Sequence, residues 1–314
     1  MALVVTMLPL HAIAQDNYPS RPIRIIVPSG AGSGVDSSSR LIAQRLSERW
    51  ERPVIVENRT GAGTIIGSEI VAKAAPDGYT LLMSPSTLAI NPATYRKMPY
   101  DALRDFAPIT HTLSLPNVIV VHPSLPVRSV KELIAIARAK PGEIVYGSAG
   151  HGTNPHLTME LLASMAHVRM IHVPYKGGPP GVVDLIGGRI AVMGTSLNYL
   201  LPHIRASRLR ALAVTSAVRV PAAAELPTVA EAGVPGYESV QWYALVAPAR
   251  TPPEIIGKLN REVVAFLRTP EVSERLARDG NVIVGSSPDE LAAFLRTETV
   301  KWARVAKAAG IEPE

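Results

Sequence analysis

The stretch that decides the fold is IRIIVPSGAGSGVD, residues 23–36. Its first five residues are β-branched apart from one arginine, which predicts a buried strand. The loop after it, residues 28–34, holds three glycines, and a helix patterned on Leu41, Ile42 and Leu46 follows. Such a loop lets backbone N–H groups approach a ligand, and the helix end carries about half a positive charge. We therefore expect this loop to bind an anion.

The same pattern occurs a second time in the middle of the chain. A predicted strand at 144–146 runs into GSAGHGTN, residues 147–154, and a helix with Leu157 and Leu161 on one face follows. Neither loop contains Lys or Arg, so amides and hydroxyl groups would hold the anion, which suits a carboxylate better than a polyphosphate. The alternative is that each loop is only a tight turn, whose glycines satisfy backbone geometry.

Strand and helix patterns alternate along most of the chain. The predicted strands lie at 23–27, 54–56, 80–83, 118–121, 144–146, 169–173, 190–193, 209–215 and 243–247. Alternation of this kind predicts an α/β fold with a mostly parallel sheet. Helical segments at 252–268, 270–279 and 288–309 close the chain, with a short apolar run at 282–284. We therefore expect the C-terminal region to fold back over an earlier domain.

Composition narrows the classes of function. The 314 residues suggest two domains, and 47% apolar with 18% charged residues is typical of a globular protein. The net charge of +6 comes from scattered basic residues, and only 5% of residues are aromatic, which argues against nucleic-acid binding and suits small anions. The absence of cysteine excludes thiol nucleophiles, disulfides and cysteine-based zinc sites.

The first 14 residues predict export from the cytoplasm. They form an apolar stretch that is too short to span a bilayer and ends in Ala12-Ile13-Ala14, the small-x-small pattern that signal peptidase accepts. We predict a signal peptide over residues 1–14 and a mature chain that begins near Gln15. A docked apolar N-terminus is the alternative. Export would make NAD and ATP poor candidates as cofactors.

The motifs of known enzyme classes are incomplete. Gly30 and Gly32 after a strand, with Glu57 after the next, imitate a dinucleotide-binding unit, but Val35 stands at the third glycine position. An NAD-type oxidoreductase with a Rossmann-like first lobe is therefore the weaker alternative. No Gly-x-Ser-x-Gly elbow or Walker phosphate loop occurs in the sequence. We expect no catalytic residue, metal or cofactor, and structural or surface roles for the histidines except His151, which lies in the second loop.

Short segments along the chain carry a resemblance to a known family. Besides the first loop, they are ENRTGAG (57–63), PDGYTL (76–81), INP (90–92), YGSAG (146–150), HVPYKG (172–177), DLIGG (184–188) and LPTVAEAG (226–233). From about Tyr18 to the C-terminus, the chain resembles the Bug family, the extracytoplasmic solute receptors of tripartite tricarboxylate transporters.

The resemblance implies a two-lobed periplasmic binding protein, type II-like, in which each lobe is a mostly parallel sheet flanked by helices. We expect lobe 1 to comprise residues 18–120 and 244–314, and lobe 2 to comprise residues 121–243. Such a receptor is not an enzyme. It captures a small organic carboxylate between its lobes and delivers it to the membrane components of the transporter. We expect a monomer, and a ligand-sensing receptor that signals without transport is a further alternative.

The resemblance also implies which residues contact the ligand. They are Ser29, Gly30, Ala31, Gly32, Ser33 and Gly34, then Ser84, Ser86 and Thr87, then Ser148, Ala149, Gly150, His151, Gly152, Thr153 and Asn154, and finally Gly194, Thr195 and Ser196. Many relatives carry an Asp or Asn at the strand end occupied here by Met193-Gly194-Thr195. Without an acid there, a ligand amino group loses a partner, so an acid that lacks an ammonium group is favoured.

Overall fold

The computed structural model describes residues 18–313. The strands are β1 (Ile23–Val27), β2 (Val54–Asn58), β3 (Thr80–Pro85), β4 (Phe106–Val121), β5 (Val145–Ser148), β6 (Ile171–Pro174), β7 (Val192–Ser196), β8 (Arg210–Val214), β9 (Val240–Pro248) and β10 (Val282–Ile283). The α-helices are α1 (Gly34–Trp50), α2 (Ile65–Ala72), α3 (Thr87–Thr94), α4 (Val130–Ala139), α5 (Asn154–Ala166), α6 (Gly178–Ile186), α7 (Leu197–Arg205), α8 (Pro253–Leu267), α9 (Pro270–Arg278) and α10 (Pro288–Ala308). Within residues 18–313, none of the helices combines the length and the apolar character that crossing a bilayer requires. The signal peptide predicted over residues 1–14 lies outside the described residues.

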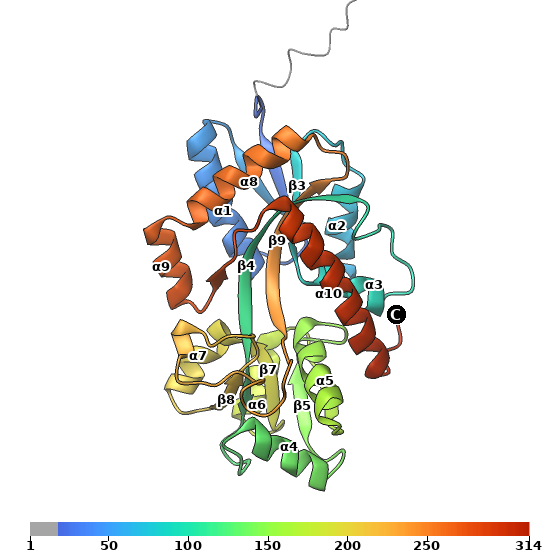
Figure 1. Ribbon diagram of the computed structural model, residues 1–314, viewed down its shortest axis with the longest axis vertical. Coiled ribbons are helices and arrows are strands. Elements are labelled where there is room, and N and C mark those ends of the chain that lie inside the picture. The colour runs from blue at the N-terminus through green and yellow to red at the C-terminus, as the bar shows by residue number, and fades with distance from the viewer. Residues whose placement is uncertain (1–17, 314) are drawn as a thin grey trace, which may run out of the picture.

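Two groups of elements lie one above the other and share the long strand β4 (Figure 1). We refer to β1–β3, β9, β10, α1–α3 and α8–α10 as lobe 1, and to β5–β8 and α4–α7 as lobe 2. The first part of β4, residues 106–116, pairs with β9, whereas residues 117–121 pair with β7. The boundaries predicted at 120/121 and 243/244 fall inside β4 and β9, and the exact division stays a prediction.

The sheets are mixed rather than mostly parallel. Their order is β2-β1-β3-β9-β4-β7-β5-β6, with β8 and β10 also paired to β4. The predicted parallel units are present, since β1 pairs in parallel with β2 and β3, and β5 with β6 and β7. The strands β4 and β9, however, run antiparallel to their neighbours. The sheets are mixed because the chain passes between the lobes in the extended strands β4 and β9. Antiparallel neighbours such as these need no helical crossover, whereas parallel neighbours do.

Strand β4 is the element that the sequence pattern predicted least completely. It runs for 16 residues, of which only 118–121 were predicted. Pro108 and Pro116 interrupt its apolar pattern, and a proline lacks the N–H that a central strand donates. The structure accommodates this with register shifts, one of them between Pro108 and Thr110. At about 3.3 Å per residue, 16 residues span about 53 Å, long enough to serve both lobes.

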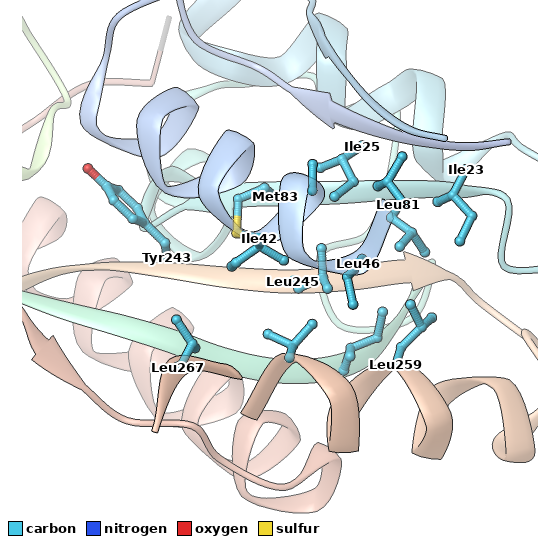
Figure 2. Packing of buried hydrophobic residues seen from close by; sticks show 14 of the residues in the cluster. Ile23, Ile25, Ile42, Leu46, Leu81, Met83, Tyr243, Leu245, Leu259 and Leu267 are labelled. Atoms are coloured by element: carbon cyan, nitrogen blue, oxygen red, sulfur yellow. The ribbon is translucent and has the colours of Figure 1, made fainter. Parts of the chain in front are cut away.

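The C-terminal helices return to lobe 1, as the sequence predicts. Figure 2 shows Leu259 and Leu267 of α8 and Ile42 and Leu46 of α1 in one buried cluster around the strands of lobe 1. Helix α10 covers the opposite face of this sheet, together with α2 and α3. Each fully buried Leu or Ile stabilises the fold by about 1.5–3 kcal/mol. This packing holds the end of β1 in place, and the first glycine loop emerges there.

Candidate functional site

A cavity of about 260 Å³ lies between the two lobes, and five helices begin at its wall. Their first residues or caps that line it are Ser33 and Gly34 of α1, Ser86 and Thr87 of α3, Thr153 and Asn154 of α5, Gly178 of α6, and Ser196 and Asn198 of α7. The first amides of a helix have no acceptor within the helix, and the helix dipole places partial positive charge there. Pro155 of α5 and Pro179 and Pro180 of α6 lack an N–H, so these two helices offer fewer amides than the other three. The cavity is therefore built to favour negative charge.

The lining of this cavity carries no formal charge. Among the described residues that line it there is no Asp, Glu, Lys, Arg or His. An anion would thus be held by amides and hydroxyl groups alone, as the sequence of both loops predicts. A hydrogen bond to a charged group contributes about 1.5–3 kcal/mol net, so about four of them reach the 8 kcal/mol of micromolar affinity.

Ser86 offers an uncommitted hydroxyl group to the cavity. Ser86 lines the cavity, only 1% of its surface is exposed, and its Oγ has no hydrogen-bond partner among residues 18–313. Buried hydroxyl groups are normally paired, and an unpaired one costs about 1–3 kcal/mol. A ligand oxygen in the cavity would accept a hydrogen bond from this hydroxyl group and remove that cost.

The first glycine loop is held in shape by the carboxylate of Asp36. Gly32 N and Asn58 Nδ2 each donate to it over 2.9 Å, and Arg40 Nε donates over 3.0 Å. Burial by itself would raise the pKa of Asp36, but these hydrogen bonds outweigh it and hold the pKa below the usual 3.8. The Gly32 amide is therefore used inside the loop, and the first amides of α1 are left for the cavity.

The second glycine loop is held by neutral side chains. Gly150 N donates to Ser148 Oγ over 3.1 Å, and Gly152 N donates to His156 Nδ1 over 3.1 Å. The rings of His156 and His172 stack with centroids 3.8 Å apart, and His172 Nε2 lies 2.6 Å from Ser148 Oγ. Burial lowers the pKa of His156 to about 3 and that of His172 to about 4. Both rings are therefore neutral near pH 7.

The structure brings part of the predicted contact set together. The predicted residues that line the cavity are Ser29, Ser33, Gly34, Ser86, Thr87, Ala149, Thr153, Asn154, Thr195 and Ser196. The predicted residues outside its lining are Gly30, Ala31, Gly32, Ser84, Ser148, Gly150, His151, Gly152 and Gly194. Several of the latter are glycines at positive φ, such as Gly32 and Gly152, which shape the turns. Ligand contact stays a prediction for the whole set.

The sequence did not predict several other residues that line the cavity. Tyr243 and Gln241 reach it from β9, and Tyr199 and Asn198 reach it from α7. A Cβ on Gly34 would lie 2.5 Å from Tyr243 Oη, so only glycine fits beside this ring. Burial raises the pKa of Tyr243, and its hydroxyl group stays protonated. No local signal could reveal these residues, because an aromatic or amide side chain in an apolar strand looks like core.

Two lobes joined through shared strands, with a polar cavity of helix N-termini between them, define a ligand-binding protein of the periplasmic type. Residues 38–311 match the family model described as "Tripartite tricarboxylate transporter family receptor". The chain therefore belongs to the family of tripartite tricarboxylate transporter receptors, which includes the Bug proteins. It is a binding protein and not an enzyme.

Solved structures agree with this assignment. R. palustris Rpa4515 with adipate is 39% identical, with a TM-score of 0.84, covering 95% of this chain and 100% of its own. The periplasmic binding protein BugD is 32% identical, with a TM-score of 0.80 and coverage of 95% and 100%. MatC from Rhodopseudomonas palustris with bound malate is 27% identical, with a TM-score of 0.78 and coverage of 92% and 99%.

The oxidoreductase alternative is wrong. The family is one of receptors, and Glu57, which would bind the ribose of a dinucleotide, is already engaged. Its carboxylate accepts hydrogen bonds from Arg24 Nε over 2.6 Å and from Arg59 over 3.1 Å. The glycines imitate a dinucleotide loop because both kinds of site place amides at a helix N-terminus.

Proposed function

We propose that this protein captures a small organic carboxylate in the central cavity and delivers it to the membrane components of a tripartite tricarboxylate-type transporter. The observation that carries the proposal is the convergence of five helix N-termini, with the free hydroxyl group of Ser86, on a cavity without charged side chains. The bound adipate of Rpa4515 and the bound malate of MatC support a carboxylate as the ligand class.

The lining also favours acids without an amino group. An ammonium group needs a carboxylate or several carbonyl acceptors, and the described lining contains no Asp or Glu. Apolar side chains such as Leu115 and Val182 line part of the cavity and suit a hydrocarbon body. We therefore place hydroxy acids and simple dicarboxylic acids ahead of amino acids.

Capture from both sides couples binding to closure of the lobes. Ser86 and Gly34 belong to lobe 1, whereas Thr153 and Thr195 belong to lobe 2. A ligand that contacts both sets stabilises the arrangement in which the lobes are close. The membrane components would then distinguish loaded receptor from empty receptor by its shape.

A calorimetric screen of mono-, di- and hydroxy-carboxylic acids tests the ligand class, with the tightest binder then titrated into Ser86→Ala. Loss of one ligand hydrogen bond is expected to weaken binding about tenfold, since it contributes about 1.5 kcal/mol. Thermal stability without ligand should not fall, because the hydroxyl group has no partner in the part of the chain that the structure describes. Ser164→Ala, an exposed serine of α5, serves as the matched control. Unchanged affinity in Ser86→Ala, or no binding of any carboxylate, would contradict the proposal.

Delivery and export need their own measurements. Uptake of the labelled binder by host cells with and without the gene separates transport from sensing, because a pure sensor leaves uptake unchanged. The proposed signal peptide predicts that protein recovered from the periplasm begins near Gln15, which N-terminal sequencing determines. Light scattering checks the proposed monomer.

A further inference from the structure

A second cavity, of about 450 Å³, adjoins the central one, and we call it the vestibule. The two cavities share Gly34, Leu115, Asn198 and Tyr199 in their linings. The vestibule lies between α1 and α9 of lobe 1 and α7 of lobe 2, which occupy the same edge of the molecule (Figure 1). A solute that enters from this edge passes Tyr199, whose surface is 53% exposed.

The vestibule holds the positive charge that the central cavity lacks. Arg205 at the end of α7 and Arg275 and Arg278 of α9 line it, against the single acid Asp279. All three arginines are exposed, and within residues 18–313 none of their guanidinium groups has a hydrogen-bond or ion-pair partner. Among the lining residues, three positive charges against one negative charge leave an excess of two, and Glu271 and Glu274 of α9 lie outside the lining.

The position of α9 beside the cleft is fixed by packing on both lobes. Val272 and Leu276 are buried in the core of lobe 1. At the end of the helix, a Cβ on Gly280 would lie 3.3 Å from Leu197 and 3.7 Å from Ala222, which belong to lobe 2. The arginines of α9 are thus held next to the entrance.

The distance from these charges to the central cavity suits long-range attraction. Asn198 lines both cavities and Arg205 lies seven residues further along α7, which is about 10 Å at 1.5 Å per residue. At such a distance a unit charge still acts on an anion when the salt concentration is low, since the Debye length is about 30 Å at 0.01 M. The attraction is proportional to the charge of the ligand.

We propose that Arg205, Arg275 and Arg278 form an anion-capture surface that speeds the entry of dicarboxylates relative to monocarboxylates. The inference rests on the proposed function, because it takes the central cavity as the destination of the ligand. Basic side chains at the mouth of a cleft raise the local concentration of anions and hence the association rate. A dianion gains twice as much as a monoanion of the same length, so the vestibule selects kinetically for two carboxylates.

The test compares association rates in stopped-flow experiments for wild type and Arg205→Gln/Arg275→Gln/Arg278→Gln. The probes are adipate, glutarate, succinate and malate, each paired with its monomethyl ester, which has the same chain and one charge less. At 10 mM salt the triple variant should bind the dicarboxylate about tenfold more slowly and the monoester about threefold more slowly. At 150 mM salt both effects should shrink, because screening shortens the reach of the arginines to about 8 Å.

A matched variant, Arg128→Gln/Arg296→Gln/Arg304→Gln, removes the same net charge from exposed arginines that line neither cavity. Its association rates should stay within about twofold of wild type, because its charges lie outside the entry path. Circular dichroism of both variants verifies that they fold, as expected for exposed side chains.

Three results would overturn the capture surface while leaving the proposed function intact. They are an equal slowing in the two triple variants, a change confined to the dissociation rate, and wild-type binding of monocarboxylates only. Failure of the wild type to bind any carboxylate would overturn both proposals together.

Discussion

The two glycine-rich loops follow one pattern in the chain, yet opposite chemistry holds them in shape. In lobe 1 the carboxylate of Asp36 accepts the amide of Gly32, and in lobe 2 the neutral ring of His156 accepts the amide of Gly152. In both loops the acceptor lies four residues after the glycine, at the third position of the helix that follows. The comparison teaches that the helix secures its own loop through a side chain of its first turn.

The difference between the loops concerns charge and therefore pH. Asp36 is ionised in the folded protein and its pKa is held below 3.8, mainly by Arg40 and Gly32 against the effect of burial. The pKa of His156 is lowered to about 3 by burial and by its neighbours His172 and His151. The first loop thus depends on the negative charge of Asp36, which protonation in acid removes. The second loop depends on a neutral His156, which protonation in acid would make positive.

The largest expected effect comes from deleting the charged acceptor. Asp36→Ala removes a buried carboxylate that accepts from Gly32 N, Asn58 Nδ2 and Arg40 Nε, and should lower the free energy of unfolding by about 3 kcal/mol. Asp36→Asn keeps an oxygen acceptor for Gly32 and should cost less, about 1–2 kcal/mol. Urea denaturation at pH 7 measures both. If the two variants are equally stable, the hydrogen bonds to Asp36 do not hold the loop.

Protonation of the histidine stack should weaken lobe 2 in acid, and His111 of lobe 1, whose pKa burial lowers to about 4, adds a similar loss that is common to wild type and the variants. The unfolded chain binds protons with a pKa near 6.5, above the folded values for His156 and His172, so the free energy of unfolding falls as pH falls through this window. From pH 7 to pH 5 each histidine should contribute a loss of about 2 kcal/mol. Glu160, whose pKa burial raises above 4.5, acts in the opposite direction and reduces the total.

Variants in the two loops separate these effects. His156→Gln should lose about 2 kcal/mol less than wild type between pH 7 and pH 5 in urea denaturation. Asp36→Asn should show the wild-type difference over the same interval, because Asp36 is ionised throughout and its stabilisation is lost only as pH falls below 3.8. Equal pH dependence in wild type and His156→Gln would mean that the stack is not the acid-sensitive element.

The smallest effects should come from the loop glycines themselves. Gly150→Ala places a Cβ 3.3 Å from the Tyr175 carbonyl oxygen at a φ of +133°, and should cost about 2 kcal/mol. Gly32→Ala meets no atom within 4 Å but has a φ of +79°, so strain alone of about 1 kcal/mol is expected. Gly30→Ala has neither problem and should be neutral. Thermal denaturation orders the three, and a reversed order would show that backbone strain does not govern these loops.

Local patterns predicted much of the fold. The apolar run before residue 28 and the glycines after it defined β1, the loop and α1, and the same signals defined β5, the second loop and α5. The strand β4 was predicted in part only, because Pro108 and Pro116 conceal it. Tyr243 and Gln241 were missed, because their place in the cavity depends on β9 pairing between β3 and β4.

The sequence by itself determined the α/β class, the two anion-favouring loops and the family, since each depends on neighbours in the chain or on ordered short motifs. Tertiary structure alone decided that five helix ends meet at one cavity and that three arginines from α7 and α9 share a vestibule. It also decided that the amides of Gly32 and Gly152 donate to Asp36 and His156. The physical reason is the distance along the chain over which each kind of signal acts. Strand and helix signals act over a few residues, whereas the crossing of β4 and β9 between the lobes brings Ser29 and Tyr243, more than two hundred residues apart in the chain, to one cavity.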